Sequence, residues 1–274
     1  MNYKKIVSTV ESLPPLLDTV DIIRRLYSEG ASSVNLSRLS IAIESDALLS
    51  ANILKMINSP LYGFSRKIDS VSQAISLFGS ELIFALVARF SIQASIVANL
   101  RPYGLSNDAF NEMCQLQSKL VSEWYKEINA SSAAFLAPLA LIMESGKLIL
   151  AKEITASGEI KAFCEGLMSA SSLSIYEHNR FSTSSYYVSG LLFEHWNLSK
   201  HYVAILKGLD YEHPTLKELQ EEIDVLDVVR TAINVREILT EESLSEASKI
   251  VTEMGHSVDA FLKAAKKLQK MRSK

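Results

Sequence analysis

The sequence predicts an almost entirely α-helical protein. Its apolar residues recur at a spacing of three and four positions, which is the periodicity of helices with one buried face. Only ten glycines and six prolines occur in 274 residues, which is few for a chain built from many strands and turns. Because 48% of the residues are hydrophobic, the chain can bury a large core. We expect a multi-helix bundle without a sheet of consequence.

The first part of the chain predicts short helices with marked ends. Residues 1–15 carry charges but no continuous apolar run, so we expect a short amphipathic helix there and not a signal peptide. Residues 16–29 and 36–43 follow with apolar residues on one face. Asp46 is placed to cap a helix over residues 47–58, which the next proline ends.

The segment from Ser70 onward predicts two consecutive helices. Ser70 and Gln73 have the spacing of a capping box, and Gly79 is placed to end the first helix in a left-handed conformation. Ser80 can then cap the second helix, which is apolar over much of its circumference. We expect this second helix to be central.

The remaining sequence predicts helices as far as the C-terminus. Residues 107–128 form the clearest amphipathic pattern and are predicted to be a core helix. Further helices are expected at about 132–153, 159–170, 173–180, 184–195, 199–209, 215–239, 243–254 and 257–271.

A change of composition after Pro214 divides the chain. We expect a main domain over residues 1–213 and a helical C-terminal extension over residues 214–274, packed on that domain. Residues 257–274 contain six basic side chains opposite an apolar face. This basic tail is predicted to dock on the body, and contact with an acidic partner or lipid head groups is the alternative.

Charge and hydropathy limit the classes of function. A net charge of −3 with no body-wide basic surface argues against nucleic-acid binding. The longest apolar run, residues 133–143, has 11 residues, whereas a membrane span needs about 20. Cys114 and Cys164 sit in helical apolar patterns and are expected to be free thiols. We therefore expect a cytoplasmic protein without a membrane span.

Two segments carry a resemblance to a known family. LPPLLDTV at 13–20 and SDALLSANILKMINSPLYGFSRKIDSVSQAISLFGSELI at 45–83 are similar to the HDOD family, whose fixed Gly, Pro, Asn and Tyr positions recur here in order. The resemblance covers roughly residues 10–210. It implies a fold related to the metal-dependent HD phosphohydrolases, loss of their catalysis, and a role in bacterial signal transduction that includes effects on motility or chemotaxis.

The resemblance also implies that the ancestral metal ligands have been replaced. Gly146, Lys147 and Leu148 match the family's relic of the HD site, whereas Met143 and Glu144 stand at its His-Asp positions. Ser185 stands where the family often has a histidine, and Leu209 and Asp210 stand at a common His-His pair. A thioether and a single carboxylate make a poor site for a hard divalent ion. We expect no enzyme activity, no catalytic residue, no cofactor and no metal, and a vacated pocket at Met143, Glu144 and Ser185.

The turn after residue 57 is the candidate interaction site. Asn58, Tyr62, Gly63 and Arg66 could form an exposed recognition turn, although helix capping and local packing also explain the first three. Arg66 has no evident helical ion-pair partner and is the strongest candidate for a functional contact. We expect the partner to be a protein in a signalling pathway.

Two other functions stay open. A metal-dependent phosphohydrolase could have rebuilt its site from Glu144, Glu177, His178, Glu194 or His195, although adjacent helical residues diverge by about 100° and each Glu-His pair could supply one ligand at most. Surface placement of both pairs is favoured. The old pocket could also bind a nucleotide without hydrolysing it.

Overall fold

The chain folds into helices joined by short connections. The computed structural model describes residues 2–16, 18–27, 34–62, 64, 66–212 and 216–272. The α-helices are α1 Tyr3–Glu11, α2 Asp18–Leu26, α3 Leu36–Glu44, α4 Ala47–Ile57, α5 Val71–Ser95, α6 Asn107–Trp124, α7 Ala130–Ile142, α8 Gly146–Ser157, α9 Ile160–Ser169, α10 Leu173–Phe181, α11 Ser185–His195, α12 Lys200–Gly208, α13 Gln220–Ala232, α14 Glu241–Glu253 and α15 Val258–Arg272. Short 3-10 helices are η2 Pro60–Tyr62, η3 Arg101–Tyr103, η4 Tyr125–Glu127 and η5 Lys217–Leu219. Within the described residues the only β structure is an isolated antiparallel bridge between Ile233 and Ile238, so the all-α prediction is confirmed.

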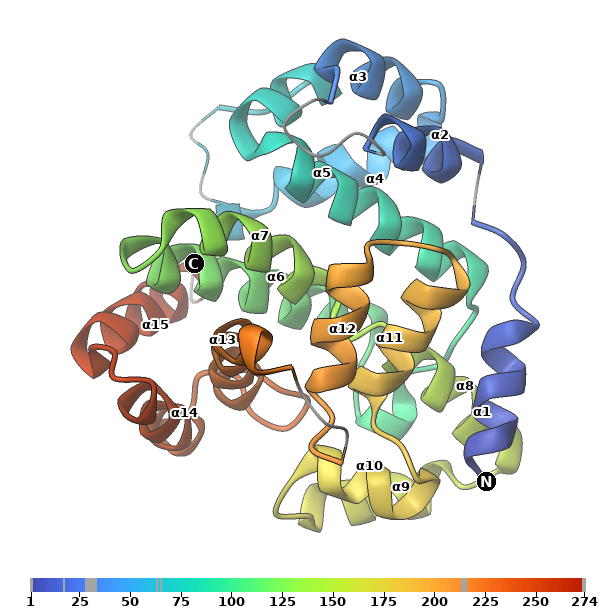
Figure 1. Cartoon of the computed structure of the whole chain (residues 1–274), viewed down its shortest axis with the longest axis vertical. Coiled ribbons are helices and arrows are strands. Elements are labelled where there is room, and N and C mark those ends of the chain that lie inside the picture. The colour runs from blue at the N-terminus through green and yellow to red at the C-terminus, as the bar shows by residue number, and fades with distance from the viewer. Residues whose placement is uncertain are drawn as a thin grey trace.

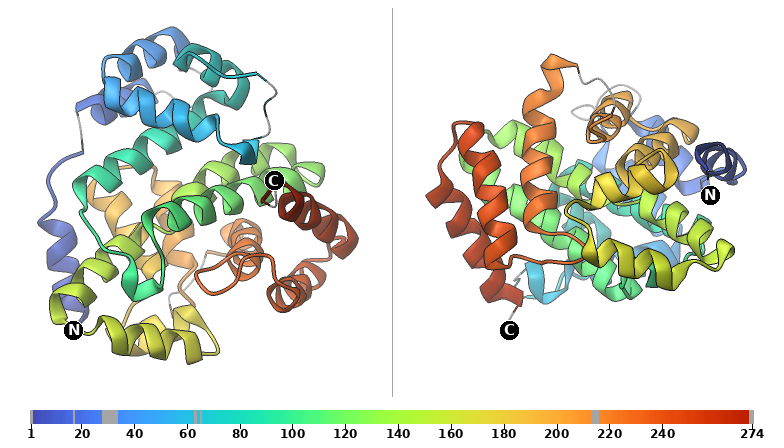
Figure 2. Two further views of the ribbon diagram at one scale, coloured as in Figure 1. Left: turned by 180° about the vertical axis from the view of Figure 1, so that it is seen from behind. Right: turned by 90° about the horizontal axis from the view of Figure 1, so that it is seen from below.

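The helices form a small lobe on a larger body. In Figure 1, α2, α3, α4 and the first half of α5 lie together at the top, and the second half of α5 runs down into the body. The body contains α6 to α12, with α1 lying against α8 and α11. Figure 2 shows the same division from behind, with α13 to α15 on the side of the body away from α1.

Gly79 divides α5 where the sequence predicts a helix end. Its φ of 80° and ψ of 161° lie outside the helical region and would strain any residue with a side chain. Ser70 caps the first half by accepting a hydrogen bond from the Gln73 amide at 3.1 Å. The second half is largely buried, in agreement with its predicted central position.

Two helix predictions were wrong in length. The segment predicted as one helix over 132–153 is two helices, because residues 143–145 form a turn between α7 and α8. The segment predicted over 215–239 is helical only from the 3-10 helix η5 to the end of α13 at Ala232. Asn234 breaks it, since its side-chain oxygen accepts hydrogen bonds from the amides of Arg236 at 3.0 Å and Glu237 at 3.1 Å.

The C-terminal extension packs on the body through α13 and α15, both of which contact α6. Phe261 of α15 lies edge-on to the buried Trp124 of α6, with ring centroids 5.4 Å apart. Arg272 forms an ion pair with Glu112 of α6 at 2.8 Å. The basic tail therefore contacts α6 as far as residue 272.

Two helical segments are long and apolar enough to cross a membrane by length and composition alone. They are Val71–Ser95 and Ala130–Ser157, and 50% and 89% of their most apolar windows are buried inside the protein. Gly79 interrupts the first, and the turn at 143–145 interrupts the second. Core helices pass the same test, so these segments are weak evidence for a membrane span.

Candidate functional site: a buried lysine centre

Glu144, Gly146, Lys147 and Ser185 stand at positions that the resemblance relates to the HD metal site. These relic positions come together where α8 meets α11. Gly146 begins α8, and a Cβ atom added to it would lie 2.0 Å from the carbonyl oxygen of Ser185 at the start of α11. The Ser189 hydroxyl locks this crossing, because it accepts a hydrogen bond from the Gly146 amide and donates one to the carbonyl of Met143, both at 2.7 Å. Only glycine allows the two helices to approach so closely.

Lys147 points into this crossing and is completely buried. Its ammonium group forms an ion pair with Glu144 and donates a hydrogen bond to the Ser185 hydroxyl at 2.9 Å. Glu144 also accepts hydrogen bonds from Gln117 at 2.8 Å and from the Tyr186 hydroxyl at 3.1 Å. A buried charge needs such partners, because its desolvation is otherwise costly.

Glu177 completes what we call the lysine centre, comprising Glu144, Lys147, Glu177 and Ser185. Its carboxylate accepts hydrogen bonds from the Tyr103 hydroxyl at 2.8 Å and from the Ser185 amide at 2.6 Å. Burial raises the pKa of Glu177, and the charge of Lys147 is the largest opposing effect. Two carboxylates thus share one lysine, and the proton affinity of Glu177 is increased.

Two tyrosine rings border the lysine ammonium. The Nζ atom of Lys147 lies 4.5 Å from the ring centroid of Tyr186 and 5.7 Å from that of Tyr103. Burial raises the pKa of both phenols well above its ordinary value, so they stay neutral and act as hydrogen-bond donors. The ammonium therefore lies among carboxylates, a hydroxyl and aromatic faces with no water-exposed side.

The expected open pocket at Met143, Glu144 and Ser185 is replaced by packed side chains. These residues are 0%, 1% and 0% exposed, and Lys147 occupies the space that was expected to be vacant. The sequence comparison assigned Lys147 only as a motif match and missed its role. Glu144, placed three residues before it in the turn that leads into α8, was the available signal.

The predicted surface placement was wrong for Glu177, which is 0% exposed. The divergence of adjacent helical residues explains why Glu177 faces inward while His178 lies near the surface, 3.7 Å from Asp210. The other pair, Glu194 and His195, is exposed as predicted. The two Glu-His pairs therefore do not come together to form one metal site.

Leu209 and Asp210 have structural contacts. The Asp210 carboxylate accepts hydrogen bonds from the amide of Ser184 at 3.1 Å and from its hydroxyl at 3.0 Å. The carbonyl of Leu209 accepts a hydrogen bond from Arg230 of the extension at 2.9 Å. These relic positions thus fasten α11 and α13 to the body.

The donor set does not fit a divalent metal ion. The described residues contain no group of three or more His, Cys, Asp and Glu side chains that could hold one. At the relic positions a lysine ammonium is paired directly with the carboxylate that a metal would need. A cation already bound by that carboxylate competes with any other.

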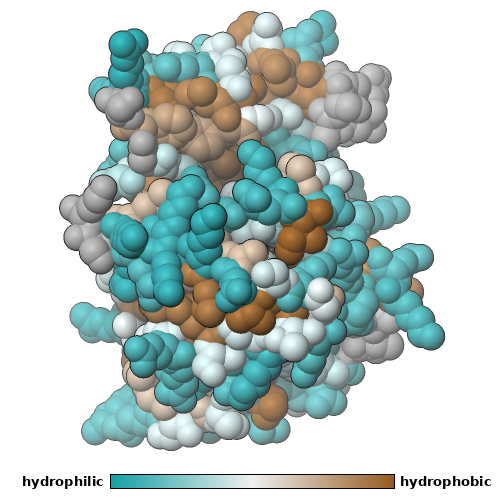
Figure 3. All heavy atoms as spheres, turned by 90° about the vertical axis from the view of Figure 1, so that its left-hand side faces the viewer, coloured by the Kyte–Doolittle hydropathy of each residue, from teal (hydrophilic) through white to brown (hydrophobic). Residues whose placement is uncertain are grey.

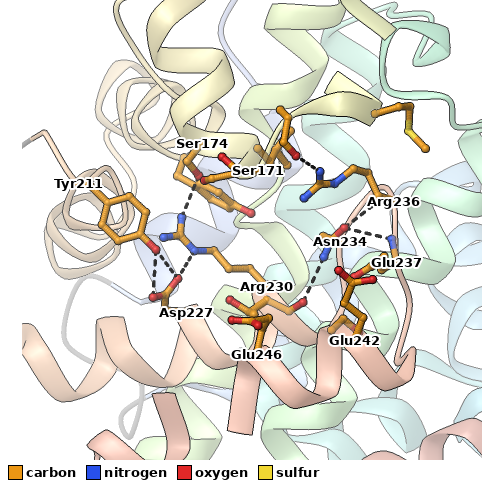
Figure 4. A pocket seen from close by; sticks show the side chains of 17 residues that line it. Ser171, Ser174, Tyr211, Asp227, Arg230, Asn234, Arg236, Glu237, Glu242 and Glu246 are labelled. Carbon is orange, nitrogen blue, oxygen red and sulfur yellow. Dashed lines mark hydrogen bonds and ion pairs between the residues drawn. The ribbon is translucent and has the colours of Figure 1, made fainter. Parts of the chain in front are cut away.

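A cleft of about 610 Å³ lies beside the lysine centre, between α10 and the extension (Figure 4). Tyr186 and Arg230 line it, and Tyr186 also donates to Glu144, so these two side chains separate the centre from the cleft. The Arg230 guanidinium lies 4.5 Å from the Tyr186 ring and 4.9 Å from the Tyr211 ring, and its Nε pairs with Asp227 at 2.6 Å. The extension therefore helps to cover the old site.

The candidate turn has an internal and an external side. Asn58 is internal, since its side chain donates to the Ile68 carbonyl and accepts from the Ile68 amide, each at 2.8 Å. The Tyr62 ring packs edge-on against Phe78, and burial raises its pKa to about 12. Arg66 is exposed, and Gly63 lies outside the described residues. Asn58 and Tyr62 hold the turn together, whereas Arg66 is accessible to a partner.

Three solved structures have a similar fold. An HDOD domain protein of unknown function from Geobacter sulfurreducens is 15% identical, with a TM-score of 0.62 and coverage of 98% of this chain and 96% of that chain. A provisionally named phosphohydrolase from Shewanella amazonensis is 14% identical, with a TM-score of 0.68 and coverage of 97% and 93%. A provisionally named signal transduction protein from Marinobacter aquaeolei is 16% identical, with a TM-score of 0.70 and coverage of 97% of this chain but 58% of that longer chain.

None of the curated proteins matches this chain significantly. The HDOD domain family matches residues 13–209, which is most of the chain and includes the candidate turn and the lysine centre. At these levels of identity the solved structures establish the shared fold alone. By this family match and by its fold, the chain belongs to the HDOD domain family.

Proposed function

We propose that this protein is a non-catalytic regulatory module that acts in signal transduction by binding a protein partner. The observation that carries the proposal is the burial of Lys147 between Glu144 and Ser185 at the relic metal positions. A metal-dependent hydrolase uses its ion to polarise phosphate and to lower the pKa of a bound water. A lysine ammonium supplies one positive charge and three N–H donors, but no open coordination position.

Membership of the HDOD family and the resemblance to a signal transduction protein both fit a regulatory role. Control of motility or chemotaxis is the specific role we propose, in the cytoplasm and without binding to nucleic acid. The net charge of −3 supports the last point, because nucleic-acid binding depends on a basic surface.

We assign the partner surface to the external side of the turn after α4. Phe64 and Leu77 are 44% and 52% exposed, and Arg66 and Lys67 are exposed beside them. Figure 3 shows hydrophobic side chains gathered over the upper part of one face, above a belt of hydrophilic ones. An apolar patch beside cations has the composition that a protein interface uses, with an arginine as an anchor.

The catalytic half of the proposal is tested on the purified full-length chain. Elemental analysis and hydrolysis assays with nucleotides and phosphoesters should find no stoichiometric Mn, Fe or Zn and no turnover, even with these ions added. Stoichiometric metal together with activity that Glu144→Gln abolishes would overturn it.

The interaction half is tested by a charge reversal. Arg66→Glu should abolish capture of the cellular partner that the wild-type chain retains, while Lys152→Glu, an exposed lysine on α8, should leave capture intact. Equal capture by Arg66→Glu and the wild type would remove this turn from the interface.

A further inference from the structure

A second cavity lies where the small lobe meets the body. Its volume is about 590 Å³, within the range of small-molecule sites. α2 forms its lobe side, and the second half of α5, α7 and α12 with the preceding turn form its body side. It shares no lining residue with the cleft beside the lysine centre.

Two aromatic pairs form much of the wall. Tyr27, directly after α2, packs on Phe84 of α5 with ring centroids 4.9 Å apart. Phe135 of α7 packs on Tyr202 of α12, also at 4.9 Å. Neighbouring aromatic faces of this kind accommodate a flat, apolar ligand body by stacking.

Cations gather at the same cavity. Arg24, Arg25 and Lys200 line it, against the carboxylates of Glu81 in the lining and Asp21 nearby. Arg24 pairs with Asp21 at 3.1 Å through one terminal nitrogen, while its Nε is buried with no acceptor among the described residues. The Arg24 side chain as a whole is 33% exposed, so its accessible N–H groups can donate charge-assisted hydrogen bonds to an anion in the cavity.

The start of α12 adds to this positive region. Ser199 caps the helix by accepting a hydrogen bond from the Tyr202 amide at 3.4 Å, and Lys200 is the first helical residue. The positive end of the helix dipole therefore lies at the cavity together with the lysine charge. Phosphate groups are favoured at such positions.

Glu81 supplies the complementary polar contact. Burial raises the pKa of its carboxyl group. A carboxyl group in the lining can accept hydrogen bonds from the ring N–H and amino groups of a base. The cavity thus combines cations for a phosphate, aromatic faces for a planar ring and an acceptor for its edge.

We propose that this seam cavity binds a nucleotide, with the phosphates at Arg24, Arg25 and Lys200 and the base between the aromatic pairs. The site is distinct from the lysine centre and does not depend on the proposed loss of catalysis. A bound nucleotide would contact both the lobe and the body, so it would stabilise their observed arrangement.

The test is calorimetric titration of the full-length chain with GTP, guanosine and inorganic pyrophosphate as separate probes. GTP should bind with a dissociation constant below about 0.1 mM, and the two fragments should each bind at least about tenfold more weakly. Lys200→Glu should weaken GTP binding by about tenfold or more, whereas Lys152→Glu should not change it. A glutamate in the first turn of α12 suits the helix dipole, so this variant should keep the wild-type melting temperature.

Arg25→Gln provides a second variant if Lys200→Glu melts early. No GTP binding by the wild type, equal binding by pyrophosphate, or equal losses in the variants and Lys152→Glu would each overturn the nucleotide site. None of these results would restore a metal centre or phosphohydrolase activity, so they would leave the proposed function unchanged.

Discussion

At the scale of single residues, Lys147 acts as an internal counter-ion. Its ammonium neutralises Glu144, and its charge also opposes the effect of burial on Glu177. Such a pair is expensive to desolvate, yet breaking it is more expensive, because one charge then remains buried alone. Removing either the positive charge of Lys147 or the negative charge of Glu144 should therefore destabilise the fold.

Lys147→Met should lower the free energy of unfolding by about 3–5 kcal/mol, because it leaves a buried carboxylate without its cation. Urea unfolding at pH 7.5 measures the loss. Lys152→Met on the exposed side of the same helix is the matched control and should change stability by less than about 0.5 kcal/mol. Similar losses of unfolding free energy in both variants would show that the Lys147–Glu144 pair does not stabilise the fold more than an exposed lysine does.

The pH dependence of this loss follows from Glu177. Its folded-state pKa is raised by burial, so its contribution to stability is complete below the ordinary carboxyl pKa and is lost as the pH rises through the raised pKa. Removing Lys147 removes the main effect that lowers this pKa and strengthens the trend. The stability difference between the wild type and Lys147→Met should thus shrink from pH 8 to pH 5, as measured by urea unfolding at each pH. A constant difference would contradict this role of Glu177.

At the scale of helices, the crossing of α8 and α11 depends on the absence of a side chain at Gly146. A methyl group there would meet the backbone of Ser185, which cannot move without shifting α11. Gly158, at the other end of α8, has a φ of 74° and open space around it. The two glycines thus serve different purposes in one helix.

Gly146→Ala should destabilise the protein by more than about 3 kcal/mol or prevent folding, since the helices must separate. Gly158→Ala should cost only about 1 kcal/mol, because it strains a single backbone position. Thermal unfolding followed by circular dichroism compares the two. The prediction fails if Gly158→Ala is the more damaging substitution.

Helix ends were predictable where a side chain and a backbone group a few residues apart determine them. Asp46 and Ser70 both cap as expected, accepting hydrogen bonds from the amides of Leu49 at 2.9 Å and Gln73 at 3.1 Å. The break after α7 was missed because no glycine or proline marks residues 143–145, and the turn is imposed by contacts with α11. The inward orientation of Glu177 was missed for the same reason, since its partners are 8 and 74 residues away.

At the scale of the whole molecule, the family match ends at residue 209, but the packed structure does not. Gln117 in the middle of the body donates a hydrogen bond to the carbonyl of Ile233 at 2.9 Å, and Trp124 is covered by Phe261. The fold class was predictable from the sequence, because it depends on local patterns. The filling of the old site and the seam cavity were not, because both depend on helices far apart in the chain.

A chain truncated after Leu209 should fail to fold stably. The truncation exposes the apolar faces of α6 and α7 that α13 and α15 cover, and large exposed apolar patches cause aggregation. Size-exclusion chromatography and thermal unfolding should show aggregation or a broad transition, in contrast to the full-length chain. A monomeric truncated chain with a sharp transition would instead make residues 214–274 an independent attachment.

In the proposed function Lys147 stands in place of a metal ion, so folding would need no ion from the cell. A protein that folds around a metal ion depends on the supply of that ion. Here the central cation is encoded in the gene and arrives with the polypeptide at synthesis. We therefore expect the amount of correctly folded protein to be the same in iron- or manganese-starved cells as in replete ones.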